Sequence, residues 1–156
     1  MLSGSCLCGD INYTFSGEVL TKALCHCLTC RKLSGSGYTT CFLVPDPDSS
    51  PEAASNFKLE SKTNTPLRES SAVHEIGLKI DFFGCAKCPS MIYKTAPDGF
   101  PGVLILFAGS LDGGEGDLRA KGGAEALGSP QAELWVKYRL PWLREVDGAK
   151  QCQQFE

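Results

Sequence analysis

Near its start the chain reads Gly4-Ser5-Cys6-Leu7-Cys8-Gly9, and a second cysteine pair follows in Gly84-Cys85-Ala86-Lys87-Cys88-Pro89. A CxC or CxxC pair on a tight turn can direct two sulfurs at one ion, and the neighbouring glycine supplies the backbone freedom that such a turn needs. Two pairs far apart in the sequence can complete one tetrahedral site. We therefore predict a structural zinc site that ties the start of the chain to its middle and contributes folding free energy. Its four thiolate ligands would be Cys6, Cys8, Cys85 and Cys88.

A third cluster, Cys25-His26-Cys27-Leu28-Thr29-Cys30, lies between these pairs. Three thiolates leave one position on zinc open, and catalytic zinc is usually held by three protein ligands. We predict that Cys25, Cys27 and Cys30 hold a second, catalytic zinc. The alternative is a second structural site completed by His26 or by a distant group. Because two predicted ligands flank His26, we expect its ring to point away from the ion.

The remaining cysteines and histidine have simpler interpretations. Cys41 lies in the apolar run 38–44, where a thiol behaves as a small buried hydrophobe. We expect Cys152 to be exposed near the end of the chain and assign it no function. His74 is expected in a strand, either packed or exposed.

Length and composition indicate an ordinary globular protein. The 156 residues suit one domain, 1–156, and 42% apolar with 21% charged residues allow a core to form. The net charge of −3 and the scattered basic residues argue against nucleic-acid binding, and no apolar stretch is long enough for a membrane span. The start shows no export signal, so we expect a cytoplasmic protein with reduced cysteines rather than disulfides. The oligomeric state is left open.

Short β-branched or alternating runs, separated by Gly, Pro, Asp and Asn, predict a mainly β protein with mostly antiparallel sheet. Short helical turns are expected at 27–33 and 123–127. The Pro-rich stretch 45–51 is expected to be an exposed loop, and the Gly- and Asp-rich stretch 111–117 a flexible one. The predicted strands are 10–15, 38–44, 73–83, 91–95, 103–109 and 133–138.

The order of these motifs resembles the family of glutathione-dependent formaldehyde-activating enzymes, grouped with centromere protein V. Residues 4–9, followed by Ile11 and Tyr13, and then residues 25–35 reproduce the family's opening pattern. Residues 109–112 resemble its later Gly-x-Leu-Asp turn, and Trp142 with 147–148 resembles its C-terminal end, so the likeness spans Ser5 to about Phe155. One departure is Pro89, where the family usually has Gly after the second CxxC pair. Both ligands of that pair are retained.

The resemblance implies a zinc-stabilised β-tent fold, two zinc ions per chain and the same division of the cysteines into a structural and a catalytic site. It also implies carbon–sulfur lyase chemistry on a small thiol adduct such as S-(hydroxymethyl)glutathione, with glutathione as a possible co-substrate. Cationic side chains after the third ligand suit the carboxylates of glutathione. The predicted substrate contacts are Arg31, Lys32, Ser34 and Gly35.

Other functions remain open at this point. The same chemistry could act on another glutathione conjugate or small metabolite, because site chemistry transfers between relatives better than substrate identity. A zinc module without enzymatic activity could bind a protein or cytoskeletal partner, although the chain has no basic tail for a polyanion. Redox catalysis by CxxC pairs is a third alternative, and the neat partition of seven cysteines into two metal sites disfavours it.

Overall fold

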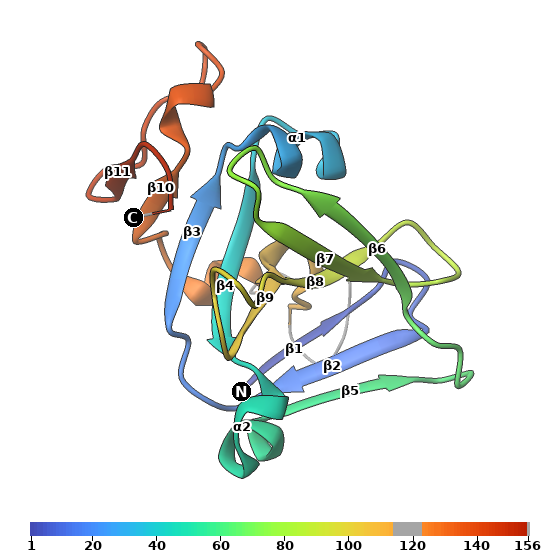
Figure 1. Cartoon of the computed structure of the whole chain (residues 1–156). Coiled ribbons are helices and arrows are strands. Elements are labelled where there is room, and N and C mark those ends of the chain that lie inside the picture. Colours follow the sequence, from blue (N-terminus) through green and yellow to red (C-terminus); the bar gives the residue numbers. More distant parts are fainter. Residues whose placement is uncertain (114–122, 156) are drawn as a thin grey trace.

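The computed structural model describes residues 1–113 and 123–155, and its fold is the mainly β, two-sheet architecture expected of a β-tent (Figure 1). The smaller sheet has the strand order β1 (Leu2–Ser5), β2 (Ile11–Phe15), β5 (Phe57–Ser61). The larger sheet has eight strands in the order β11 (Lys150–Cys152), β10 (Ala132–Leu134), β3 (Thr21–Cys25), β4 (Thr39–Pro45), β9 (Val103–Phe107), β8 (Met91–Thr95), β7 (Lys79–Gly84), β6 (Arg68–Val73).

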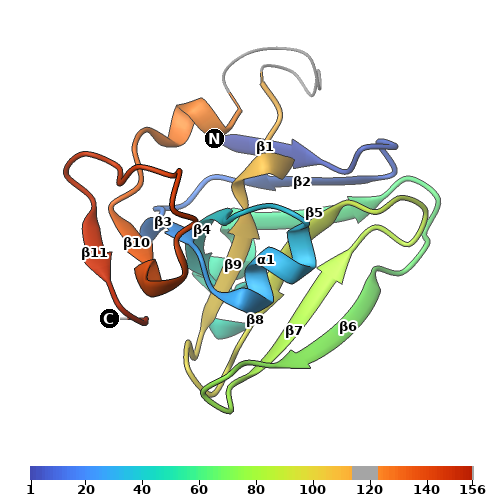
Figure 2. The same cartoon turned by 90° about the horizontal axis from the view of Figure 1, so that it is seen from above.

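The helices are short. They are α1 (Leu28–Ser34) and α2 (Pro51–Asn56), with 3-10 turns at Pro47–Ser49, Ala108–Ser110, Ala124–Leu127 and Val136–Tyr138. Pairing is antiparallel except at β10, which runs parallel to both β3 and β11. No hairpin turn joins β10 to either neighbour, so its direction is not fixed by a local connection. In both views the C-terminal end lies beside β10 and β11 (Figure 2).

Most predicted strands are confirmed, but three were drawn too long. The predicted strand 103–109 ends at Phe107, where a 3-10 turn begins. The predicted strand 73–83 is interrupted by a turn in which His74 N–H donates to Leu78 O at 2.8 Å and Gly77 adopts a φ of 82°. The predicted strand 133–138 ends at Leu134 because Trp135 takes a left-handed conformation, with φ 59°. The strands that the pattern missed are β1, β3, β5, β6 and β11.

The two expected loops fare differently. The Pro-rich stretch 45–51 is not simply a loop, since it forms a 3-10 turn and then starts α2, with Ser50 as the N-cap and Pro51 in the first turn. Pro suits the first helical turn because its missing N–H would have no partner there. The predicted loop 111–117 lies outside the described residues from Gly114 onward.

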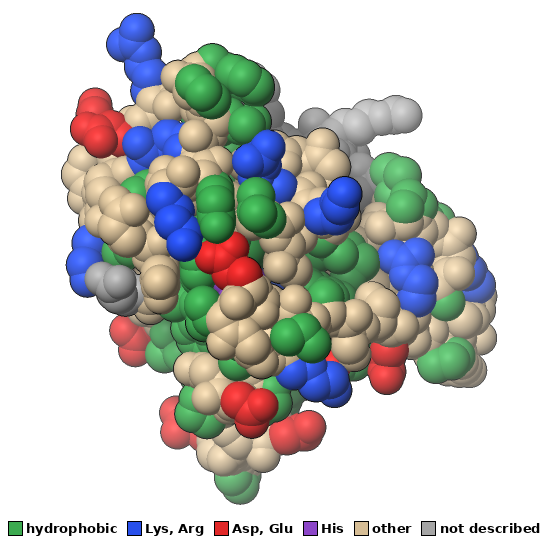
Figure 3. Space-filling model, turned by 45° about the horizontal axis from the view of Figure 1, so that its top comes forward, with side chains coloured by type: hydrophobic (Ala, Val, Ile, Leu, Met, Phe, Trp, Pro, Cys, Tyr) green, Lys and Arg blue, Asp and Glu red, His purple; other side chains and the backbone are tan. Residues whose placement is uncertain are grey.

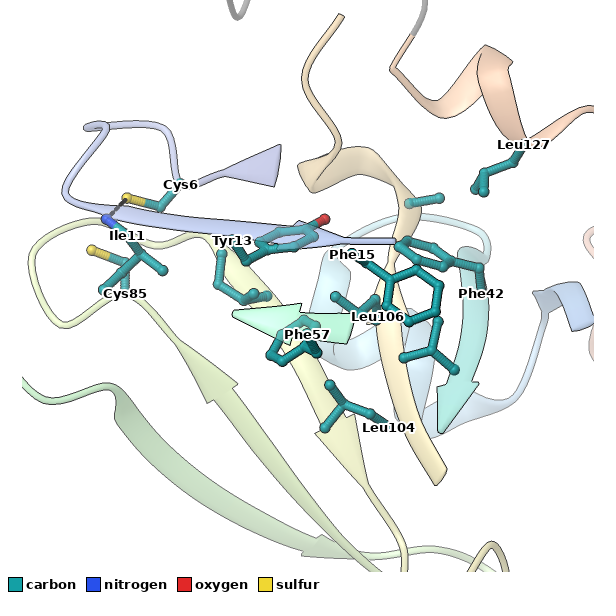
Figure 4. Close-up of a cluster of buried hydrophobic side chains, with 13 residues drawn as sticks. Cys6, Ile11, Tyr13, Phe15, Phe42, Phe57, Cys85, Leu104, Leu106 and Leu127 are labelled. Carbon is teal, nitrogen blue, oxygen red and sulfur yellow. Dashed lines mark hydrogen bonds between the residues drawn. The ribbon is translucent and has the colours of Figure 1, made fainter. Parts of the chain in front are cut away.

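The main core lies between the two sheets (Figure 4). Tyr13 and Phe15 of β2 and Phe57 of β5 pack against Phe42 of β4 and Leu106 of β9. Alternate residues of β9 face the other way, where Ile105 and Phe107 join a second cluster with Ile80 and Phe82 of β7. Strand β9 is thus covered on both faces, which explains why its sequence is a continuous apolar run.

The residues outside the two predicted zinc sites are placed as follows. Cys41 is 3% exposed in the second cluster, as predicted. The prediction for Cys152 was wrong, because β11 pairs with β10 and leaves this residue 2% exposed. His74 lies in the turn after β6 rather than within a strand, and it packs between the rings of Trp135 and Phe155. Among the described residues, no helix has the length and apolar character to cross a bilayer.

Close packing at Gly4 gives a first prediction. A Cβ atom at this position would lie 2.2 Å from Cζ of Tyr13, whose ring is buried and whose hydroxyl lies 2.8 Å from Ser110 Oγ. We expect Gly4→Ala to lower the free energy of unfolding by about 1–3 kcal/mol, the usual effect of overpacking. Gly109→Ala is the control, because nothing lies within 4 Å of its added Cβ. Equal urea midpoints for both variants would contradict this packing argument.

Candidate metal centres

The four cysteines of the two outer pairs converge at one end of the main core. Their sulfurs lie within 4.8 Å of one another, with Cys6 Sγ 3.5 Å from Cys8 Sγ and Cys8 Sγ 3.7 Å from Cys85 Sγ. Figure 4 shows Cys6 and Cys85 side by side next to Ile11. Zinc with four Zn–S bonds of about 2.3 Å needs sulfurs about 3.8 Å apart, so the donor set fits a tetrahedral thiolate site.

The backbone around this four-cysteine cluster is arranged to stabilise thiolates. Ile11 N–H donates to Cys6 Sγ at 3.2 Å, and Lys87 N–H donates to Cys85 Sγ at 3.3 Å. Burial raises the pKa of Cys88, but hydrogen bonds with Ser90 outweigh it and lower that pKa to about 6. The turn after Cys8 depends on Gly9, which has a φ of 73°.

Polar contacts also join the two turns that carry these cysteines. Leu7 N–H donates to Ser90 Oγ at 2.8 Å, and Lys87 Nζ lies 3.3 Å from Asp10 Oδ1. Asp10 additionally accepts from the hydroxyls of Ser61 and Thr63. The N-terminal and middle segments are therefore held together around the sulfurs by hydrogen bonds as well as by any bound ion.

The other three cysteines converge where β3 meets α1. Cys25 is the last residue of β3, Cys27 is the N-cap of α1, and Cys30 lies in the first helical turn, with its N–H donating to Cys27 Sγ at 3.3 Å. Their sulfurs lie within 4.8 Å of one another, and all three residues are at most 3% exposed. Within 1–113 and 123–155, no fourth Cys, His, Asp or Glu joins this three-cysteine cluster. The donor set thus suits a zinc ion with one position free of protein ligands.

A buried lysine lies directly beside the three-cysteine cluster. Lys94 of β8 is 6% exposed, and its Nζ donates to Cys30 Sγ at 3.2 Å. Hydrogen bonds with Cys25 and Cys27 lower the pKa of the Cys30 thiol, and the charge of Lys94 lowers it further. Burial lowers the pKa of Lys94, but the charges of Cys41, Cys30 and Cys25 outweigh it and raise that pKa above its usual value. The arrangement favours a thiolate next to an ammonium group.

His26 points into the protein toward β10. Its Nε2 lies 2.9 Å from Oε2 of Glu133, which is fully buried, and Arg139 Nη2 donates to the same oxygen at 2.7 Å. The backbone N–H of Val146 donates to the other carboxylate oxygen. His26 is not part of the group of converging sulfurs, which agrees with the expectation that its ring points away from them. Its Nδ1 has no hydrogen-bond partner among the described residues.

Two cavities lie near the three-cysteine cluster. A small cavity of about 40 Å³ touches Cys25, Cys41 and Lys94, and Phe155 forms part of its wall; its other lining residues are apolar. A larger cavity of about 520 Å³ extends from Leu33 and Ser34 of α1 to Pro89 and Ser90 beside the four-cysteine cluster. The ring of Phe107, which lies 5.5 Å from Lys94 Nζ, lines the larger cavity.

The predicted substrate contacts are not all brought together. Ser34 lines the larger cavity, as does Pro89, whereas Lys32 lines a separate groove between α1 and β6. Arg31 donates to Tyr138 O at 3.3 Å, and Gly35 ends α1 with a φ of 65°. Figure 3, with the α1 side brought forward, shows Lys and Arg side chains spread over this face rather than gathered around one opening.

Comparison with known proteins now assigns the family. The model of the family described as glutathione-dependent formaldehyde-activating enzyme matches residues 1–138. The chain belongs to this family. A structural-genomics crystal structure of a Rhodobacter sphaeroides protein has a similar fold, with a TM-score of 0.50 and 14% sequence identity over 82% of this chain and 96% of that chain. At this identity the likeness concerns the fold alone, and no curated protein matches the chain.

The sequence predicted the cysteines of both clusters, but it did not identify three residues that surround the three-cysteine cluster. Lys94 carried a usable signal, because strand alternation places it on the same face as Ile92, which is fully buried. Glu133 carried none, since its burial depends on the parallel pairing of β10. Trp135 packs on the three cysteines and is fully buried, and only its left-handed backbone, invisible in the sequence, directs it there.

The buried carboxylate of Glu133 gives a second prediction. We expect Glu133→Gln to lower the free energy of unfolding by about 3 kcal/mol, because it removes one partner of a buried ion pair with Arg139. Glu75→Gln is the control, since Glu75 pairs with Lys137 at the partly exposed surface and should contribute less than about 1 kcal/mol. Urea unfolding of both variants measures the difference. Similar losses would show that Glu133 contributes no more than a surface pair.

A pH dependence follows from the same carboxylate. Burial raises the pKa of Glu133, but hydrogen bonds from Val146, His26 and Arg139 outweigh it and hold the folded pKa below its ordinary value of 4.5. A depressed folded pKa gives stability that is fully present above the unfolded pKa and is lost as the pH falls through the folded value. The difference in unfolding free energy between wild type and Glu133→Gln should therefore narrow below pH ~4.5. A difference that widens there would contradict this assignment.

Proposed function

We propose that this chain is a zinc-dependent carbon–sulfur lyase acting on a small thiol adduct such as S-(hydroxymethyl)glutathione, in a reducing, cytoplasmic setting. The observation that carries the proposal is the three-cysteine cluster, in which Cys25, Cys27 and Cys30 converge without a fourth acidic, histidine or cysteine ligand in the described chain. Family membership supplies the reaction class. The four-cysteine cluster would hold a second zinc ion with no free position, which suits a structural role.

Zinc at the three-cysteine cluster would supply a positive charge that stabilises a substrate thiolate and polarises an aldehyde oxygen. In the lyase direction the C–S bond breaks and sulfur leaves with the electron pair. The hydroxyl group of the adduct would release its proton to water as the C=O bond forms, and thiolate and aldehyde would result. Lys94 would keep Cys30 ionised, because its Nζ donates to that sulfur.

The two cavities share no lining residue and are two separate candidate places for parts of an adduct. The small cavity touches Cys25 and accommodates only a few atoms, so the reacting sulfur and carbon would lie there. The larger cavity has room for a peptide-like thiol and is lined by the hydroxyl side chains of Ser5, Ser34, Ser90 and Ser110. Arg31 and Lys32 of α1 line neither cavity, and we propose that they attract the carboxylates of glutathione as it approaches the protein.

Metal content and turnover test this function together. We expect purified wild type to contain two zinc ions and Cys27→Ser to lose one of them together with turnover of glutathione adducts. Cys152→Ser is a matched control, because Cys152 is also buried but belongs to neither group of converging sulfurs and lines neither cavity. Metal analysis measures the zinc content. A screen of glutathione adducts, beginning with the formaldehyde adduct, measures turnover.

Three outcomes would contradict the proposal. Equal turnover by wild type and Cys27→Ser on every adduct would show that the three-cysteine cluster is not catalytic. Stable binding of a macromolecule with no adduct turnover would favour the zinc interaction module. A measured zinc content well below one ion per chain would favour redox catalysis by the cysteine pairs.

A further inference from the structure

The ammonium group of Lys94 has an unusual position for a lysine. It is 6% exposed, it lies 3.2 Å from Cys30 Sγ, and the small cavity beside it is lined otherwise by apolar side chains and the thiols of Cys25 and Cys41. No carboxylate of the described residues forms an ion pair with it. The ring of Phe107, with its centroid 5.5 Å from Nζ, covers another side.

A charge in such a place needs a compensating charge. Moving an ammonium group out of water costs several kcal/mol even after relaxation, and the cost is recovered only by a close anion with good geometry. The sulfur of Cys30 is the hydrogen-bond acceptor that the structure provides. The buried contact with Cys30 Sγ makes the lysine part of the charge balance of the three-cysteine cluster.

The charges of the cluster then give the role of the lysine. Three thiolates and a divalent ion sum to −1, and Lys94 brings the total to zero. An anionic fourth ligand, such as a substrate thiolate, would bring the total to −1 with the lysine present and to −2 without it. Each added negative charge in a dry site is increasingly unfavourable, because low dielectric strengthens repulsion.

We propose that Lys94 is the positioning residue that lets the three-cysteine site accept an anionic sulfur ligand, by neutralising the charge of its own thiolates. The proposal rests on the proposed metal site and names its ligand class as thiolates. It also distinguishes the two clusters. At the four-cysteine cluster Lys87 pairs with Asp10 and is 41% exposed in its side chain, and Lys94 is the buried lysine of the described residues.

The test uses Lys94→Met, which keeps the length and apolar stem of the side chain and removes the charge. The matched control is Lys22→Met on β3 of the same sheet, because Lys22 Nζ donates to Leu127 O and contacts no cysteine. Each protein is loaded with Co²⁺ as a spectroscopic substitute for zinc. Metal affinity is titrated first, and 2-mercaptoethanol is then added while the sulfur-to-cobalt charge-transfer band is followed.

We expect Lys94→Met to bind 2-mercaptoethanol roughly 10- to 100-fold more weakly than wild type, the range for a charge-assisted hydrogen bond. The metal affinity of the three-cysteine site should fall in Lys94→Met. The four-cysteine site should keep its ion, which would show that the variant is folded. Lys22→Met should behave as wild type. If Lys94 only fills space, Lys94→Met will bind 2-mercaptoethanol as tightly as wild type, and this result would overturn the proposal.

The outcomes separate this proposal from the proposed function. Wild type that binds two cobalt ions and takes up thiol, with Lys94→Met unchanged, overturns the role of Lys94 alone. Wild type that binds one ion, or that binds two without taking up thiol, overturns the open metal site and with it this proposal. Loss of both ions in Lys94→Met would show that the lysine is required for folding and would overturn a role confined to one site. Lys94→Gln is tested alongside. If it keeps the ion of the four-cysteine site, the loss in Lys94→Met is due to poor accommodation of the Met side chain.

Discussion

The convergence of two cysteine pairs at the end of the main core is the constraint on which the remaining structure depends. One pair follows β1 and the other follows β7, so four sulfurs join the small sheet to the far part of the large one. The main core between the sheets begins at this point, with Cys6 and Cys85 themselves among its fully buried members. A small sheet of three strands buries little area by itself, and an ion bound by these four sulfurs would offset that weakness by linking it to the larger sheet.

The second group of sulfurs depends on a different kind of support. Cys25 ends a strand that is paired on both sides, with β4 and with β10. Buried polar groups hold the surrounding elements in place: the carboxylate of Glu133 connects His26 to Arg139, and Lys94 reaches Cys30 from β8. Such networks specify one arrangement only when each charge is compensated. The three-cysteine cluster is thus held by strand pairing and by buried polar contacts as well as by any bound ion.

The sequence was informative where chemistry is local and uninformative where it depends on pairing. Cysteine spacing identified both groups of converging sulfurs, and alternation located strands such as β2 and β8. The pattern located β10 but not its parallel pairing, and nothing local marks β11. That pairing buries Glu133 and Cys152, so the expectation that Cys152 is exposed failed. The left-handed backbone of Trp135 is equally invisible, since tryptophan has no preference for it. Tertiary contacts determine the burial of Glu133 and Cys152 and the backbone conformation of Trp135.

The two clusters differ in the property that should separate a structural from a reactive zinc. At the four-cysteine cluster, Cys8 is exposed and the adjacent Lys87 is paired with Asp10. At the three-cysteine cluster every sulfur is buried and the compensating charge is an ammonium without a carboxylate partner among the described residues, in an apolar cavity. Low dielectric strengthens the field of that ammonium at the place where a substrate sulfur would carry negative charge. The number of ligands and the placement of one lysine therefore both support the proposed division of roles.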